Sequence, residues 1–298
     1  MPDPANLDLH KDVTLFREAV NFTAAQTGFH PRLVEKDYFS TVLLAYLSSR
    51  AGQQLVFKGG TCLAKVHAGF YRLSEDLDFT VPLSVGAGRT KRRHAVAATK
   101  DAVAELSRCE DVFSLTEPLT GANNSTQYNG TVAYESPTTG QPETILIEVS
   151  LREPLLMQPT TGQTRTLLLD PVGGQPIAPE ITLTCIEMAE AMAEKFRAAL
   201  SRRDVAIRDF YDLDYAASHL GLDPADPRLI EMVRQKLAVP GNPPVDMGPA
   251  RLADLKRQLN TRLRTVLRDR EFQAFNLDRA CQFVAGMARD VSRPSDLS

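Results

Sequence analysis

The chain has 298 residues, of which 24% are charged and 43% are hydrophobic, and its formal net charge is −3. These proportions are typical of a globular protein and exclude an intrinsically disordered one. The length predicts two domains or one large domain. The mean charge excludes a protein coated in basic residues, although a mean value hides local patches.

The sequence shows no signal for a membrane or for export. No apolar run reaches the roughly 18 residues of a membrane span, and residues 1–4 lack the basic segment that opens a secretory signal peptide. Cys62, Cys109, Cys185 and Cys281 are far apart and form no CxxC pair. We therefore expect a cytoplasmic protein with reduced, mostly buried thiols and no zinc site.

The first part of the chain mixes helical and extended patterns. Residues 10–50 are predicted to be helical, because apolar residues recur at helical spacing after Glu35-Lys36-Asp37-Tyr38. The apolar run Leu55–Phe57 predicts a short strand, and Gly59-Gly60-Thr61 follows it at the start of a second helical pattern. Apolar and polar residues then alternate over Leu77–Val81, which predicts a strand with one buried face.

A basic loop, a helix and two strands are predicted next. Residues 83–94 form the predicted loop, which carries the basic run Arg89–Arg93, and the helix is predicted over Ala95–Leu106. Residues 126–151 predict two strands around a loop at Ser136–Gly140, because apolar residues alternate with polar ones in the second strand.

The remainder is predicted to be helical. After a loop at Pro154–Pro179, apolar residues recur at three- and four-residue steps, and Pro240–Pro249 separates two helices. We therefore expect residues 1–155 to contain a helical lead-in and an α/β core. Residues 156–298 are expected to form a mainly helical C-terminal domain.

Two glycines stand where the first strand passes into a helix. Gly59 and Gly60 allow backbone N–H groups to approach an anion closely, and a helix N-terminus favours negative charge. Lys58 would add a positive charge for a phosphate, and Thr61 would add a hydroxyl. A Gly-Gly pair alone more often marks a tight turn, and the GxxxxGK[ST] pattern is absent.

Asp76 and Asp78 lie two residues apart on a predicted strand, so both carboxylates point to the same side. Two like charges this close repel each other unless a cation lies between them. Oxygen ligands of this kind suit Mg²⁺, which also binds substrate phosphates. An isolated D-x-D pair is common on exposed strands, but Leu77, Phe79 and Val81 favour a strand with one buried face.

Three further charged residues are candidates for a site. Glu148 interrupts an apolar strand, which indicates a paired or metal-bound carboxylate, although a partly wet strand face explains it equally well. Lys195 lies at the edge of the apolar stripe of its helix and would reach toward a triphosphate. An ordinary exposed lysine is the alternative. Arg208 and Asp209 are consistent with a local ion pair of little energy.

Several of these pieces occur together in one order. They are Glu35-Lys36-Asp37-Tyr38, Gly59-Gly60-Thr61, Arg72-Leu73-Ser74-Glu75-Asp76-Leu77-Asp78-Phe79, Ile147-Glu148-Val149, Glu194-Lys195-Phe196-Arg197 and Arg208-Asp209-Phe210-Tyr211-Asp212-Leu213. The ordered set resembles the AbiEii/AbiGii-type nucleotidyltransferase toxin family, which includes the MenT-like toxins. The resemblance covers residues 30–215, and residues 220–298 match no motif.

The resemblance implies an α/β (α+β) fold with a polymerase-β-like nucleotidyltransferase core and a helical C-terminal domain. It also implies roles for individual residues. The nucleotide phosphates would be held by Lys58, Gly59, Gly60 and Thr61. Mg²⁺ would be bound by Asp76 and Asp78. The third carboxylate, which varies in these toxins, would be Glu148, and the remaining positions needed for activity would be Lys195 and Asp209.

The implied function is that of a Mg²⁺-dependent toxin of a toxin–antitoxin system, with a cognate antitoxin as partner. It would transfer a nucleoside monophosphate from an NTP to an RNA acceptor, the tRNA 3′ end, and so block translation. The basic runs at 89–93 and 251–270 support an RNA contact weakly, because solvated helix faces with ion pairs look the same. Alternatives are a small-molecule (aminoglycoside-type) nucleotidyltransferase, a protein nucleotidyltransferase, and a non-catalytic interaction protein with a relic site.

Overall fold

The computed structural model describes residues 7–51, 54–84 and 86–293. Residues 1–4, on which the prediction of no signal peptide was based, lie outside these ranges. The chain divides into two compact units, Met1–Ile186 and Glu187–Ser298. Within the described residues, no helix has the length and apolar character needed to cross a bilayer.

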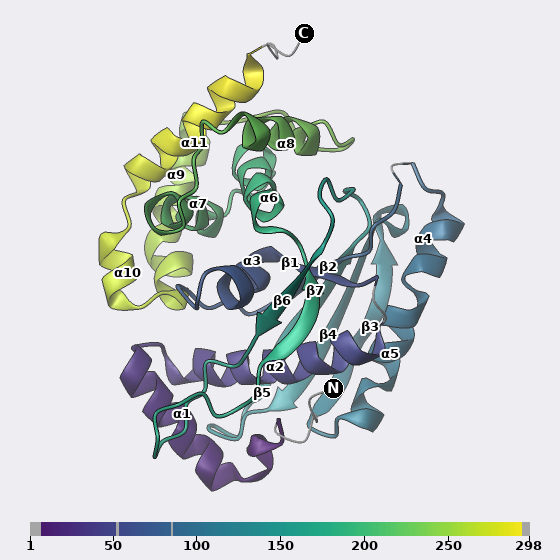
Figure 1. Ribbon diagram of the computed structural model, residues 1–298, viewed down its shortest axis with the longest axis vertical. Helices are drawn as coiled ribbons and strands as arrows, with labels where there is room; N and C mark the ends of the chain where they lie inside the picture. Colours follow the sequence, from purple (N-terminus) through teal and green to yellow (C-terminus); the bar gives the residue numbers. More distant parts are fainter. Residues whose placement is uncertain (1–6, 52–53, 85, 294–298) are drawn as a thin grey trace. The chain divides into compact units, whose positions relative to one another are not determined.

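A seven-stranded mixed sheet forms the centre of the first unit (Figure 1). Its strands are β1 (Val56–Lys58), β2 (Leu77–Thr80), β3 (Phe113–Ala122), β4 (Gln127–Glu135), β5 (Pro142–Ser150), β6 (Thr160–Thr164) and β7 (Ile181–Cys185). Their order in the sheet is β3-β4-β5-β2-β1-β7-β6. β2 is antiparallel to β1 and parallel to β5, while β1 is parallel to β7.

The first unit also contains helices. They are α1 (Val13–Thr27), α2 (Pro31–Arg50), α3 (Gly59–Cys62), the π-helical turn η3 (Leu63–His67), α4 (Arg89–Ala95) and α5 (Ala97–Cys109), with short 3₁₀ turns η2 (Leu9–Lys11) and η4 (Asn123–Ser125). Of these, α2, α3, η3 and α5 contact strands of the sheet. α2 begins at Pro31, whose fixed φ suits a first helical position. Most of α2 is buried.

An aromatic cluster joins α2 to the sheet. The ring of Phe39 on α2 stacks on that of Tyr134 on β4, with centroids 4.0 Å apart. Phe39 also meets Tyr38 and Phe113 edge-on. Offset and edge-on pairs of this kind add attraction beyond the area they bury. The cluster therefore fixes α2 and its charged side chains against the strands.

Three of the predicted elements in the first unit are wrong. The basic run at Arg89–Arg93 lies in α4, not in a loop, because α4 buries none of its side chains and so leaves no apolar period to detect. β6 lies inside the predicted loop Pro154–Pro179, and β7 occupies the start of the segment predicted to be helical. Because β6 and β7 join the first sheet, the compact unit that contains this sheet runs to Ile186.

The second unit is helical, as predicted. Its elements are α6 (Met188–Ser201), α7 (Ile207–His219), α8 (Pro227–Leu237), α9 (Pro249–Gln258), η5 (Leu259–Leu263), η6 (Arg264–Val266), α10 (Asp269–Ala274) and α11 (Leu277–Ser292). The Pro/Gly-rich break falls between α8 and α9. The buried Lys236 ties α8 to α6 through ion pairs of 2.6 Å to Glu190 and 3.1 Å to Glu194.

Candidate active site

A row of charged side chains crosses three neighbouring strands. Lys58 on β1 is the cross-strand partner of Asp78 on β2, and Asp78 is in register with Glu148 on β5. Side chains of directly paired residues lie on the same face of a sheet. All three are half-buried, whereas Phe57, Leu77, Phe79, Ile147 and Val149 beside them are buried. The sheet therefore gathers these three predicted site residues on one face.

Gly59 directly follows Lys58 and lies at the turn between β1 and α3. Its φ is +75°, a left-handed value that side-chain-bearing residues rarely adopt. A Cβ built on Gly59 would lie only 2.1 Å from Oδ2 of Asp78. The Asp78 carboxylate thus rests directly on the backbone of the turn, and only glycine leaves room for it.

Arg72, which the sequence analysis does not assign to the site, approaches the same turn. A Cβ on Gly60 would lie 2.4 Å from Nη2 of Arg72 and 3.3 Å from Oγ of Ser74. Arg72 is only 1% exposed, and its Nη1 donates to the Leu73 carbonyl at 3.2 Å. A buried guanidinium at this position adds positive charge to the predicted phosphate-binding turn. In the sequence, only its position as the first residue of the Arg72–Phe79 segment pointed to a place in the site.

Thr61 anchors the turn to the start of β2. Its hydroxyl donates to the backbone carbonyl of Asp76, and its side chain is 3% exposed. This hydrogen bond fixes the distance between α3 and the two aspartates. Because the hydroxyl proton is used there, a phosphate contact from Thr61 would come from its backbone N–H.

The donor set of Asp76 and Asp78 fits a hard divalent cation. Carboxylate oxygens are the ligands that Mg²⁺ prefers, and Mg²⁺ needs few protein ligands when substrate phosphates complete its shell. Asp76 lies one residue before β2 and is half-buried like Asp78. Asp76, Asp78 and Glu148, all of them described, do not form a group whose ligand atoms all lie within 4.8 Å of one another. The three carboxylates are therefore not gathered into one compact ligand set.

A group of that compactness does occur nearby. Ligand atoms of Cys62, His67 and Cys185 lie within 4.8 Å of one another, because the parallel pairing of β7 with β1 brings Cys185 close to α3. Spacing in the sequence does not reveal this group. Nε2 of His67 is 3.0 Å from the carbonyl of Ile186. Three ligands are one short of the four that structural zinc sites use, and we assign no metal here.

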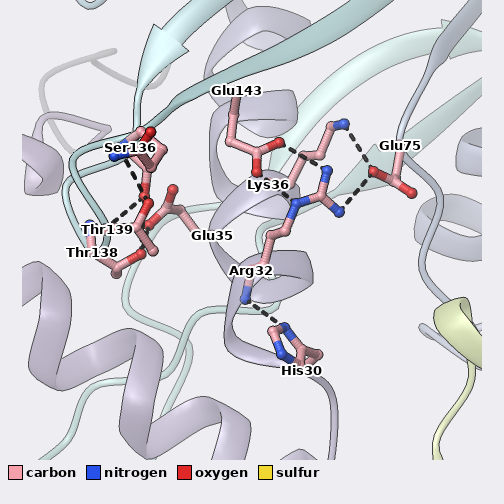
Figure 2. A network of polar contacts seen from close by, with 10 residues as sticks. His30, Arg32, Glu35, Lys36, Glu75, Ser136, Thr138, Thr139 and Glu143 are labelled. Carbon is pink, nitrogen blue, oxygen red and sulfur yellow. Dashed lines mark hydrogen bonds and ion pairs between the residues drawn. The ribbon is translucent and has the colours of Figure 1, made fainter.

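The predicted lead-in motif Glu35–Tyr38 acts as a structural clamp (Figure 2). Glu35 accepts hydrogen bonds from the backbone N–H and the hydroxyl of Thr138, in the turn between β4 and β5. Asp37 forms a buried 2.5 Å ion pair with Lys65 of η3 and accepts from the backbone N–H of Leu167 at 2.7 Å. One helix thus holds three separate parts of the first unit.

The same clamp holds the segment that carries the aspartates. Lys36 contacts Glu75 at 2.9 Å and Arg32 contacts it at 3.1 Å, while Arg32 also forms a two-pronged bond to Glu143 (Figure 2). Burial alone would raise the pKa of the Glu75 carboxyl, but its contacts with Lys36 and Arg32 outweigh burial and hold that pKa below its ordinary value. Since Glu75 precedes Asp76 directly, these contacts position the segment that carries Asp76 and Asp78.

Glu75→Gln is expected to remove a pH-dependent part of the stability. Because the folded-state pKa lies below the unfolded one, ionised Glu75 stabilises the fold above pH 4.5, and this stabilisation is lost as the pH falls through the folded-state pKa. We expect the free energy of unfolding to fall by about 1–2 kcal/mol near neutral pH and to decrease less steeply in acid. Urea unfolding as a function of pH measures this, with the exposed Glu18→Gln as control. Identical profiles for Glu75→Gln and wild type would contradict it.

Lys195 and Asp209 form a cluster inside the second unit. Nζ of Lys195 on α6 lies 2.8 Å from Oδ1 of Asp209 and 2.8 Å from Oδ2 of Asp212, both on α7. Both carboxylates are buried, and Arg202 approaches Asp209 at 3.7 Å. The structure therefore pairs the two predicted residues and adds Asp212. The sequence analysis considered an ion pair between Asp209 and Arg208, but in the structure Asp209 pairs with Lys195.

Lys195→Met is expected to destabilise the second unit strongly. The substitution leaves two buried carboxylates facing each other without their shared cation, and removing one partner of a buried ion pair costs about 3–5 kcal/mol. Adding Asp212→Asn to Lys195→Met should recover part of the loss. Thermal unfolding measures both effects, with the exposed Lys256→Met as control. A stability loss under about 1 kcal/mol for Lys195→Met would mean that the cluster is not structural.

A cavity of about 740 Å³ lies away from the charged row. It is lined by Val56, Pro82, Lys91 and Met157 among other residues. Val56 and Pro82 belong to the end of the β1–β2 pair opposite Lys58 and Asp78. The cavity and the charged residues therefore indicate two different positions for the active site. We follow the chemistry, because open, polar nucleotide sites depend on charged groups and backbone N–H donors more than on enclosure.

The chain is similar to known proteins in family and in fold. The family model for the nucleotidyl transferase AbiEii toxin of type IV toxin–antitoxin systems matches residues 42–295. The crystal structure of JHP933 from Helicobacter pylori has a TM-score of 0.50 at 16% identity, over 88% of this chain and 93% of that one. A second H. pylori crystal structure has a TM-score of 0.48 at 16% identity, over 85% and 92%. No curated protein matches the chain.

The fold and the family match define the protein as a nucleotidyltransferase with a mixed α/β core and a helical C-terminal part, as predicted. The chain belongs to the AbiEii nucleotidyltransferase toxin family of type IV toxin–antitoxin systems. Membership implies an NTP substrate and an antitoxin partner, and enzymes of this class generally use a divalent metal.

Proposed function

We propose that the protein transfers a nucleoside monophosphate from an NTP to the 3′ end of tRNA in the cytoplasm, with Mg²⁺ held by Asp76 and Asp78. The observation that carries this proposal is the Asp78 carboxylate resting on Gly59 at the β1–α3 turn. In this proposal a metal ligand would lie directly beside the backbone that binds the phosphates. That proximity is the arrangement that phosphoryl-transfer sites require.

Each residue of the first unit has a distinct task in this reaction. Backbone N–H groups of Gly59 and Gly60 bind the nucleotide phosphates, and Lys58 and Arg72 offset their charge. Bound Mg²⁺ supplies further charge neutralisation and orients the phosphates. The acceptor 3′-oxygen forms a bond to the α-phosphorus while the bond to pyrophosphate breaks. Catalysis is then mainly positioning and electrostatic stabilisation.

Glu148 is the candidate for handling the acceptor proton. It lies in register with Asp78 on the neighbouring strand and is half-buried. In this proposal Glu148 would accept the proton of the attacking hydroxyl or would help to hold the metal. The family resemblance gives Lys195 and Asp209 a part in activity. Lys195 would neutralise the leaving pyrophosphate, and its pair with Asp209 would orient it.

The test is incubation of the purified protein with total tRNA, Mg²⁺ and each NTP in turn, labelled at the α-phosphate. We expect label at the tRNA 3′ end with a preference among the four NTPs, and no label when the γ-phosphate is labelled instead. Periodate-treated tRNA, which lacks the terminal hydroxyls, is the matched control and should accept nothing.

Three results would redirect the proposal. Label on a small molecule or on protein, with none on tRNA, would favour the alternative acceptors. Label from the γ-phosphate would replace nucleotidyl transfer by phosphoryl transfer. Absence of NTP binding, with the phenotype retained in an Asp76 variant, would favour a relic site.

A further inference from the structure

A second basic feature lies on the sheet face opposite the carboxylates. A hollow of about 510 Å³ is lined by residues of the α4–α5 segment and of the end of the β3–β4 hairpin. It is lined by Arg89, Arg93 and Lys100 from the helices and by Ser125 and Tyr128 from the hairpin. Tyr128 is in register with the buried Val149, whereas its neighbour Asn129 is in register with Glu148 on the other face. The hollow is therefore separate from the charged row.

Among the described residues, the three cations of this hollow have no carboxylate partner. No ion pair within 4.0 Å joins Arg89, Arg93 or Lys100 to an acid of the described ranges, and all three are exposed. Asp101 also lines the hollow and is the one acid there. Two guanidinium groups one helical turn apart, with an ammonium on the next helix, suit an anion that offers several oxygen atoms.

Tyr128 adds a buried donor to the same hollow. Its side chain is 2% exposed, and its hydroxyl has no hydrogen-bond partner among the described residues. Its ring lies on Gly121, the residue directly across the hairpin, where a Cβ would be 2.9 Å from Cε1. Buried hydroxyls normally find a partner. A ligand oxygen in the hollow would satisfy this one.

The second basic run differs, because the structure neutralises most of it. Arg251 donates to the carbonyls of Ala199 and Arg202 at 2.7 Å and so closes the end of α6. Four more arginines of this run form ion pairs, namely Arg257 with Asp254, Arg264 with Asp269, and Arg268 and Arg270 with Glu271. The prediction of a solvated, ion-paired face therefore holds for most of residues 251–270.

Backbone geometry holds the hollow in shape. Asn123, Asn124 and Ser125 have φ values of 50°, 57° and 62°, three consecutive left-handed residues that cost conformational energy. Nη1 of Arg92 donates to the Asn124 carbonyl at 2.9 Å and ties this turn to α4. The hairpin end and the basic helix are thereby fixed relative to each other before any ligand arrives.

We propose that this hollow binds a backbone phosphate of the RNA acceptor, away from the reacting 3′ end. The proposal rests on the RNA acceptor of the proposed function. Unpaired arginines, a lysine and a free hydroxyl donor match the oxygen atoms of a phosphodiester, and phosphate contacts position nucleic acids without reading their sequence. The hollow takes no part in NTP binding, because it lies on the other face of the sheet.

The test is binding of fluorescent total tRNA to the full-length protein without NTP, over a range of salt concentrations. We expect Arg89→Ala/Arg93→Ala to weaken binding at least about tenfold at moderate salt and to lower the slope of log K against log salt by about 1.5. Tyr128→Phe, which removes only the hydroxyl, should weaken binding a few-fold without changing the slope. Arg108→Ala, an exposed arginine of α5 outside the hollow, is the matched control.

Transfer kinetics separate this inference from the proposed function. In Arg89→Ala/Arg93→Ala, the KM for tRNA should rise while the KM for NTP and kcat stay unchanged. Unchanged tRNA binding and slope in that variant, with wild-type transfer to tRNA intact, would overturn the hollow alone. If Lys256→Ala/Arg262→Ala weakens tRNA binding and Arg89→Ala/Arg93→Ala does not, the phosphate contact lies in the second unit and not in the hollow. Failure of wild type to bind or label any RNA would overturn both proposals.

Discussion

Asp78→Asn is expected to reduce nucleotidyl transfer by a factor on the order of 10³ or more, which corresponds to about 4 kcal/mol of activation free energy. Asparagine keeps the shape of the side chain over Gly59 and removes only its charge. The loss therefore reports the electrostatic contribution of the carboxylate as a metal ligand. Asp76→Asn should give a loss of similar size. Initial rates with α-labelled NTP, together with melting temperatures, measure both.

Glu148→Gln is the matched comparison for this variant. Glu148 shares the strand register of Asp78 but lies outside a compact ligand group with the two aspartates. We therefore expect its loss to be smaller than that of Asp78→Asn. If folded Asp78→Asn keeps more than about a tenth of wild-type transfer, the metal assignment is wrong.

Gly59→Ala is expected to impair both the fold of the turn and the reaction. A left-handed φ of +75° costs an alanine roughly 1–2 kcal/mol, and the new methyl would lie 2.1 Å from Oδ2 of Asp78. The carboxylate must move by an ångström or more. A misplacement of about 1 Å costs on the order of 100-fold in rate, so we expect at least that loss. Transfer assays and urea unfolding measure the two effects separately.

Gly69→Ala provides the control for backbone strain. Gly69 has a similar φ of +61°, but a Cβ there would meet no atom within 4 Å. It should therefore lose similar stability and keep near-normal transfer. Equal loss of activity in both variants would attribute the effect of Gly59→Ala to strain, and not to displacement of Asp78.

Local patterns predicted the elements that have one buried face. In β5, buried residues alternate with half-buried ones, and in β2 the half-buried Asp78 lies between the buried Leu77 and Phe79. The apolar residues of α6 recur at helical steps. Each of these elements therefore has a periodic pattern in the sequence. β3 and β6 are edge strands that are mostly exposed, and α4 buries nothing, so none of them has a period to detect. Hydrophobic periodicity in the sequence is therefore visible in elements with a buried face and absent in exposed elements.

The candidate site divides in the same way. Spacing along the chain predicted that Asp76 and Asp78 share one side of a strand, because that relation is local. Three other relations depend on long-range pairing: Lys58 opposite Asp78, Arg72 beside Gly60, and Lys195 between Asp209 and Asp212. Residues far apart in sequence reach each other only through the sheet register or helix packing. The candidate site residues could be identified from the sequence. The residues that they contact in the fold could not.

The central claim is that the β1–α3 turn and the two aspartates form the nucleotide site. Its most direct test is an experimental structure of the protein with Mg²⁺ and a non-hydrolysable NTP analogue. We predict metal density bound by Asp76 and Asp78 and the nucleotide phosphates on the backbone of Gly59 and Gly60. Phosphates bound elsewhere, for instance in the cavity beside Val56 and Pro82, with no metal at the aspartates, would contradict the account.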